Sequence, residues 1–416
     1  MQQSSITGFF KKTPRPNASR EDGNRSNNNR QERRPGPYRS RSGSSTQSTR
    51  GQHRGGKSPR NMELKKIAEE TKAVLPAVLK PLPGFGADVS SIHDVNGLVP
   101  LDAKDCPRRT LPNGDKDAGR AGTRIRVLDK DSFDAAIELQ PNYKAHVHLS
   151  NSSASATASS INSKPDVSSA ADDEEMDLDG LPLNQPQPPV PSWDLSAKPS
   201  KQANPQLSPA TSRHTSKPVA VLNLASERHA GGGWQNGAMA QEEAMCYRSS
   251  LYLSLHKSYY PLPSLSVIYT PSVLIIRSAT SAGHILYTAP APDLPVTSVI
   301  SVAALRHPAL TDDSKNFKNK DQRAETKRKI RISLRVAASM GHTKLVLGAL
   351  GCGVFSNPPT EVAECFLEVF REKEFQGGWW EDVVFAVMDN ARGGEGGKGG
   401  SGNYGQFYRV LDDQVV

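Results

Sequence analysis

The sequence predicts a mixed α/β domain in which helices cover both faces of a central sheet. Short apolar runs that suit buried strands alternate with segments whose apolar residues recur at helical spacing. Two of these runs, 219–224 and 345–350, are each followed by a glycine-rich turn and then by a helical pattern. Such alternation is typical of three-layer α/β/α domains with a mixed sheet.

Composition separates folded from irregular parts of the chain. The 416 residues contain 36% hydrophobic residues, 33 glycines and 31 prolines, which indicates long irregular segments. We expect a disordered basic tail (1–60), an N-terminal accessory segment of the domain (61–141), a disordered low-complexity insertion (142–216) and the core of the domain (217–416).

The net charge of +9 is concentrated in the tail. Residues 1–60 carry 14 of the 52 Lys/Arg and 3 of the 43 Asp/Glu residues, which leaves a net charge of −2 for the rest. A near-neutral folded part argues against a domain whose main face binds duplex DNA. Non-specific nucleic-acid contact by the tail and a merely solvated tail both stay open. The acidic cluster at 172–179 either pairs with the tail or is a solvated run.

The four cysteines have no metal-ligand spacing, so we expect a reduced intracellular protein without disulfides, located in the nucleus, the cytoplasm or both. No apolar run reaches the length of a transmembrane helix, and the N-terminus lacks the pattern of a signal peptide. We expect a monomer.

The accessory segment begins with a helical pattern from Leu64 to Leu75, which we expect Pro76 to end. Residues 123–128 alternate as a strand does, and Asp131 or Ser132 caps a short helix over 133–139.

In the core, helices are expected over 327–341 and from Thr360 or Glu361 onward, and a loop over 259–269. Further strands are expected at 273–277, 285–288, 296–303 and 383–388. Residues 404–411 read as a terminal edge strand after a flexible glycine-rich segment, 393–402. We do not interpret that segment as phosphate-binding, because no helix is expected after it.

The first unit joins the 219–224 strand to a glycine triplet, Gly231 to Gly233, and then to Gln241, Glu242 and Glu243 at a helix start. Glycines allow positive φ and close approach of a ligand to main-chain N–H groups. Two carboxylates beside such a loop suit acid/base chemistry on a sugar. Taken singly, the triplet is also an ordinary loop, and the carboxylates also suit helix capping.

The second unit joins the 345–350 strand to Gly348-Ala-Leu-Gly-Cys-Gly-Val-Phe355 and an amphipathic helix. A strand, a glycine-rich loop and a helix N-terminus form a general anion-binding arrangement. Together, the two units resemble the compact microbial type of poly(ADP-ribose) glycohydrolase, whose catalytic domain is a macrodomain. The resemblance covers about 61–140 and 217–416, with its specific motifs at 226–243 and 348–355.

The resemblance implies hydrolysis of the ribose–ribose O-glycosidic bond of poly(ADP-ribose), with Glu243 as catalytic acid and base. It implies that Glu242 holds a ribose hydroxyl and that Gln241 helps to orient the pair. The loop residues Gly231, Gly232, Gly233, Gly351, Cys352, Gly353 and Val354 would wrap the diphosphate and distal ribose, and Phe355 would pack on that ribose.

Ser226 departs from the Asn that related macrodomain enzymes often use to bind the distal ribose; its shorter hydroxyl still suits that sugar. By the same resemblance no metal or other cofactor is needed, and the scattered histidines form no ligand set. The family also includes proteins that only bind ADP-ribose, which gives a second interpretation. A measurement of turnover distinguishes such a binding protein from an enzyme.

The first residues carry a separate motif. Gln3, Ile6, Phe9 and Phe10 fit a pattern that resembles the box by which peptides dock on the sliding clamp, PCNA. In a single helical turn the three apolar side chains would share one face and fill an apolar pocket. A chance match is the alternative. An adaptor that brings the domain to the clamp is therefore a third functional class beside an enzyme and an ADP-ribose-binding module.

Overall fold

The structure is a computed structural model that describes residues 59–160, 216–391 and 394–416. These residues fall in one compact unit, 56–416. The clamp-like motif of residues 3–10, the rest of the basic tail to residue 58 and the acidic cluster at 172–179 lie outside the described residues. The predictions made for them are therefore not tested by the fold.

A seven-stranded mixed sheet forms the centre, with the strand order β1-β4-β5-β3-β6-β7-β2. From β5 to β2 all neighbouring strands run parallel, whereas β4 runs antiparallel to both β1 and β5. The strands are β1 (Ser91–Asp94), β2 (Ile125–Leu128), β3 (Ala220–Ala225), β4 (Ser266–Leu274), β5 (Val296–Ala303), β6 (Lys344–Leu347) and β7 (Asp382–Ala386).

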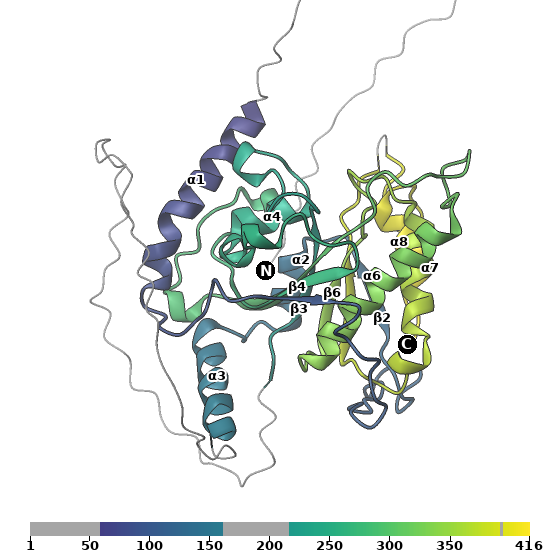
Figure 1. The fold of residues 1–416 in the computed structure, drawn as a ribbon, viewed down its shortest axis with the longest axis horizontal. Coiled ribbons are helices and arrows are strands. Elements are labelled where there is room, and N and C mark those ends of the chain that lie inside the picture. The colour runs from purple at the N-terminus through teal and green to yellow at the C-terminus, as the bar shows by residue number, and fades with distance from the viewer. Residues whose placement is uncertain (1–58, 161–215, 392–393) are drawn as a thin grey trace, which may run out of the picture. The chain divides into compact units, whose positions relative to one another are not determined.

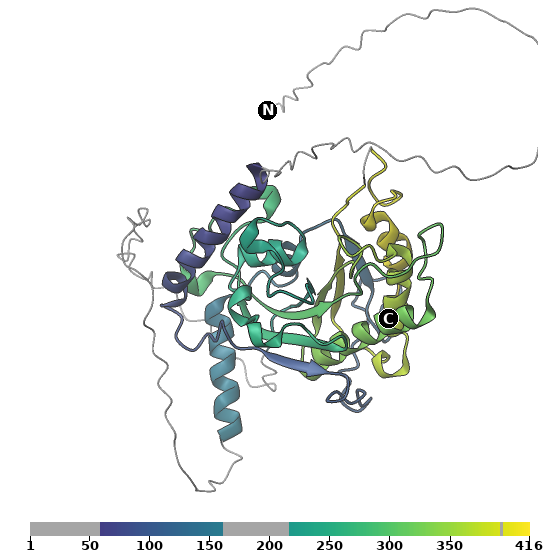
Figure 2. The ribbon, with the colours of Figure 1, turned by 45° about the horizontal axis from the view of Figure 1, so that its top comes forward.

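Alternate strand residues pack on opposite faces of this sheet. Leu345 and Leu347 join a cluster with side chains of α6, α7 and α8, whereas Val346 joins a cluster with α1, α2 and α4. Figure 1 shows these two groups of helices on opposite sides of the strands, and the turned view in Figure 2 keeps that arrangement. The helices are α1 (Pro59–Leu79), α2 (Ser132–Leu139), α3 (Ala145–Ser160), α4 (Gln241–Arg248), α5 (Leu251–Ser254), α6 (Lys320–Ser339), α7 (Pro359–Phe370) and α8 (Asn403–Leu411).

The predicted three-layer α/β class with a mixed sheet is thus confirmed. The strand at 296–303 coincides with β5, and Asp131 caps α2 through bonds from the main-chain N–H groups of Phe133 and Asp134. None of the helices in the described ranges is long and apolar enough to span a bilayer.

Five predictions about elements were wrong, the first being the strand at 285–288, where only Leu286 forms an isolated bridge, to Arg277. Residues 404–411 form helix α8 rather than an edge strand, because Tyr404, Phe407 and Leu411 are buried at helical spacing. A helix therefore follows the glycine-rich segment, and the reason given above for excluding anion binding there does not hold. Ser266 already begins β4, inside the predicted loop 259–269.

The other two concern helices. Pro76 lies inside α1, which continues to Leu79 because the flanking Leu75 and Leu79 pack into a core cluster that holds the last turn in place. The predicted insertion begins too early, since residues 145–160 form α3. The first turn of α3 packs Ala145 and Val147 on the same cluster.

This fold brings three loops together at one edge of the sheet. Because β3, β5 and β6 are parallel neighbours, their carboxyl ends lie side by side. The loops that follow them are 226–240, 304–319 and 348–358. In open α/β sheets this edge is where ligands bind.

Candidate active site

The loop between β3 and α4 is held rigidly by its own residues. Gly231 and Gly232 have positive φ (70° and 60°), which a residue with a side chain rarely adopts. Trp234 is buried, and the Tyr247 hydroxyl donates to the carbonyl oxygens of Trp234 (2.8 Å) and Ala238 (2.7 Å). These bonds hold the part of the loop that directly follows the glycine triplet.

Glu242 lies in a buried polar site at the carboxyl end of β3. Its Oε2 accepts a hydrogen bond from the main-chain N–H of Ser226 (2.7 Å), and its Oε1 faces the side-chain amide of Asn223 (3.4 Å). Burial raises the pKa of Glu242 to about 8, and the neighbouring Glu243 adds to the rise, although the bonds from Ser226 and Asn223 oppose it. Burial therefore favours the protonated form of Glu242 in the folded protein.

Glu243 lies one residue further along α4 and faces the glycine triplet. Its Oε1 accepts from the N–H of Gly233 (2.9 Å) and its Oε2 from the N–H of Ala240 (3.0 Å). The second bond is half of a capping box, so the capping role considered above is present in the structure. Each oxygen keeps a lone pair beyond these bonds, on which a proton can sit.

Gly232 lies against both carboxylates. A β-carbon added at this position would overlap Glu243 Oε1 and would lie 3.0 Å from Glu242 Oε2. The main chain therefore approaches the two acids more closely than any other residue type would allow.

Gln241 joins the start of α4 to the sheet. Its amide nitrogen donates to the carbonyl of Leu222 (2.8 Å) and to the Ser132 hydroxyl (3.1 Å), and its amide oxygen accepts from the N–H of Leu224 (2.9 Å). β3 pairs with β6 only at Ala220 and Val221, so Gln241 binds main-chain groups of β3 beyond that pairing. The contacts suit the orienting role expected of Gln241, and its amide is occupied within the protein.

The second glycine-rich loop is stabilised by one buried side chain. Asn357 donates from Nδ2 to the carbonyls of Leu305 (2.7 Å) and Gly351 (3.1 Å). Gly351 has positive φ (75°), and a β-carbon there would overlap Asn357 and lie 2.6 Å from the Ala304 methyl group. The loops after β5 and β6 are thus packed together without room for a larger residue.

The predicted binding residues of this loop differ in their exposure to solvent. Gly353 and Val354 are exposed, whereas the Cys352 thiol is buried, and burial raises its pKa. Phe355 is half-buried and lies under the Arg306 guanidinium, whose Cζ is 4.4 Å from the ring centroid. The main chain of this loop, rather than the Cys352 side chain, is available to a ligand.

Ser226 uses its hydroxyl locally. Its Oγ accepts from the N–H groups of Arg228 and His229, both at 3.2 Å. The main-chain N–H of Ser226 binds Glu242, as described above. To make the predicted sugar contact, this hydroxyl must bind the sugar while it still accepts the two N–H bonds.

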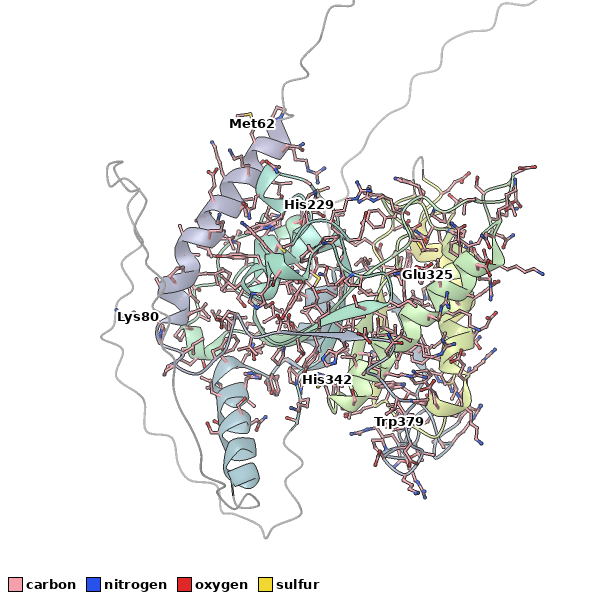
Figure 3. All side chains as sticks on the ribbon, in the orientation of Figure 1. Met62, Lys80, His229, Glu325, His342 and Trp379 are labelled. Carbon is pink, nitrogen blue, oxygen red and sulfur yellow. The ribbon has the colours of Figure 1, made fainter. Side chains whose placement is uncertain are left out.

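The histidines do not gather. Figure 3 shows His229 and His342 well apart, and the chain places them at opposite ends of the parallel strands, after β3 and before β6. The described residues contain no group of three His, Cys, Asp or Glu side chains that could hold a metal ion. All four cysteines are buried free thiols.

A family model described as "Microbial-type PARG, catalytic domain" matches residues 198–278, which include β3, the glycine triplet and both glutamates. The chain resembles the microbial-type PARG catalytic domain. The resemblance stated from the sequence is confirmed over these residues. A comparison with curated proteins found no match.

Solved PARG structures align with most of the chain. The X-ray structure of poly(ADP-ribose) glycohydrolase from Thermomonospora curvata has 23% identity and a TM-score of 0.49, covering 84% of this chain and 99% of that chain. The same figures hold for that enzyme bound to the inhibitor ADP-HPD. The Deinococcus radiodurans enzyme in complex with ADP-ribose has 24% identity and a TM-score of 0.46, covering 79% and 98%.

Among the polar residues at this site, Asn223 and Arg306 were not predicted from the sequence. Asn223 was included in an apolar strand, although a buried amide needs partners; it donates to Glu242 and to Ser301 Oγ (3.0 Å). Arg306 directly follows the predicted 296–303 strand. Its position at the carboxyl end of a parallel strand was the signal that could have found it.

Proposed function

We propose that this chain is a poly(ADP-ribose) glycohydrolase that releases ADP-ribose by hydrolysing ribose–ribose bonds. The observation that carries the proposal is the pair of buried glutamates on α4, against which the Gly232 main chain packs closely. The match to the PARG family model and the second glycine-rich loop on the neighbouring strand support it.

In the proposed reaction Glu243 gives its proton to the leaving ribose oxygen while the glycosidic C–O bond breaks. An oxocarbenium-like state forms at the anomeric carbon. Glu243 then takes a proton from a water molecule, whose oxygen bonds to that carbon, and the acid is restored. Glu242 holds a ribose hydroxyl by a hydrogen bond. Main-chain N–H groups of the two glycine-rich loops bind the diphosphate.

The test is release of ADP-ribose from poly(ADP-ribosyl)ated protein by wild type and by Glu243→Gln. Glutamine keeps the shape and one of the two accepting oxygens but carries no transferable proton. We expect release to fall by about 3–4 orders of magnitude. Glu364→Gln, which changes an exposed carboxylate on α7, is the matched control and should match wild type.

The alternative is a module that binds ADP-ribose without turnover. Wild type that binds ADP-ribose but releases none from the polymer would establish that alternative. A Glu243→Gln variant as active as wild type would show that Glu243 acts only as a helix cap.

We further propose that residues 3–10 recruit the enzyme to the sliding clamp, which would place it in the nucleus and in DNA repair. The support is the motif formed by Gln3, Ile6, Phe9 and Phe10 in an otherwise polar tail. The basic residues that follow would add non-specific contact with nucleic acid. Peptide 1–15 should bind the clamp saturably, and the double change Phe9→Ala with Phe10→Ala should abolish binding. Binding that ignores this change would reject the proposal.

A further inference from the structure

One arginine connects the three loops at the site. Arg306, in the loop after β5, forms a two-pronged ion pair with Glu227 in the loop after β3. Its Nε lies 2.6 Å from Oε1, and one terminal nitrogen lies 3.2 Å from Oε2. The same guanidinium covers the ring of Phe355 in the loop after β6. No other side chain described above contacts all three loops.

The pair is charged and its geometry is fixed. Burial disfavours ionisation of Glu227, but the hydrogen bond and charge of Arg306, a backbone hydrogen bond and the charge of Arg228 together outweigh it, so the pKa of Glu227 is lowered. The bond from Glu227 in turn raises the pKa of Arg306. A planar guanidinium held at two points presents one face to an aromatic ring, which a lysine cannot do.

The main chain around Phe355 is held separately. The N–H of His307 donates to the Phe355 carbonyl (2.9 Å), and Asn357 binds the Leu305 carbonyl. These contacts place the Phe355 main chain and do not involve its ring. The ring itself is covered by the Arg306 guanidinium.

We propose that Arg306 is a positioning residue that orients Phe355 for the distal ribose, with Glu227 as its anchor. The inference rests on the proposed function, in which Phe355 packs on that ribose. A ring already held in place loses less conformational freedom when substrate binds. Arg306 would therefore affect substrate affinity and not the proton transfer by Glu243, which lies on α4.

The experiment measures kcat and KM on poly(ADP-ribose), and Kd for ADP-ribose, for Arg306→Met, Phe355→Leu and the double variant. Arg306→Met should raise KM and Kd about tenfold, with kcat within about twofold of wild type. The double variant should be no weaker than Phe355→Leu alone, because Arg306 acts through the ring. Arg306→Lys keeps the charge but loses the planar two-pronged group. Its KM and Kd should lie between those of Arg306→Met and wild type.

Arg331→Met is the matched control. Arg331 lies on α6 and makes an equivalent two-pronged pair with Glu372, in which both N–O distances are 2.6 Å. It should leave KM and Kd unchanged. If Arg306→Met does not fold, Glu227→Gln releases Arg306 from the other side and should raise Kd in the same direction.

Unchanged KM and Kd in Arg306→Met would overturn the inference. So would additive effects in the double variant, which would mean that Arg306 contacts substrate directly. If wild type binds ADP-ribose without turnover, the proposed function fails while the Kd comparison still decides the role of Arg306. A wild type that does not bind ADP-ribose overturns both.

Discussion

The main chain of Gly232 lies so close to the Glu243 carboxylate that a β-carbon on Gly232 would overlap Oε1. The glycine also has a φ of 60°, which costs an L residue about 1–2 kcal/mol. These two constraints together restrict position 232 to glycine.

We expect Gly232→Ala to fold and to lose about a hundredfold in kcat, because displacing the acid by about 1 Å has an effect of that order. Turnover of poly(ADP-ribose) together with thermal unfolding measures both outcomes. Gly399→Ala is the control, since no atom lies within 4 Å of a β-carbon there. Wild-type kcat in Gly232→Ala would show that the acid does not depend on this contact.

Glu242 should make the protein less stable as pH rises. Burial raises its pKa in the folded state to about 8 from the ordinary value of 4.5. The folded state therefore holds one more proton between these values, and the stabilisation is complete below about pH 4.5 and lost as pH rises through about 8. Urea unfolding of wild type and Glu242→Gln from pH 5 to 9 tests this.

The unfolding free energy of wild type minus that of Glu242→Gln should decrease as pH rises. Taking that difference cancels other titrations, including those of His148 and His342, whose pKa burial lowers to about 4. A pH-independent difference would show that Glu242 is ionised in the folded protein. The measured value belongs to the Glu242–Glu243 pair, since the two groups interact.

Arg248 should contribute strongly to stability. Its guanidinium is fully buried on α4 and pairs with Asp131 and with Asp134 (2.6 Å) on α2. Arg248→Met should destabilise the protein by about 3 kcal/mol, since it leaves two carboxylates without their partner. Arg126→Met breaks an exposed pair with Asp382 and should cost less than about 1 kcal/mol. Equal costs in urea unfolding would contradict this ranking.

Tyr247→Phe should loosen the loop that carries the glycine triplet. It removes the hydroxyl that binds the Trp234 and Ala238 carbonyls, at a cost of about 1–2 kcal/mol. Because Gly233 donates to Glu243 from the same loop, kcat should also fall, by less than in Gly232→Ala. Tyr259→Phe, whose hydroxyl binds Ser90 at 3.2 Å, is the control for kcat.

Local patterns predicted the parts of the fold that local physics decides. The apolar run that became β5, the cap of α2 and the glycine turns were predictable, because burial and φ constrain single segments. Residues 404–411 were assigned to the wrong element, because their aromatic and β-branched residues favour a strand although Tyr404, Phe407 and Leu411 recur at helical spacing. The Arg306–Glu227 pair joins residues 79 positions apart, and no periodicity indicates such a contact.

The site residues divide in the same way. Glu242 and Glu243 were identifiable because a specific spacing from the glycine triplet accompanies them. Asn223, Asn357 and Tyr247 hold the loops from a distance in sequence, and their roles depend on which main-chain groups the fold leaves for them. These long-range contacts can be recognised only in the folded structure, once the strands are in place.

Helix α1 also determines where the protein can be shortened. The carbonyl of Asn61 fills the space beside Gly237, so that a β-carbon on Gly237 would overlap it. Gly237 ends the short turn Trp234–Asn236 that follows the glycine triplet. A recombinant protein cut after Asn61 would therefore remove a wall of the active-site loop, whereas a cut before Pro59 keeps it. An affinity tag joined at Pro59 would lie two residues from that wall.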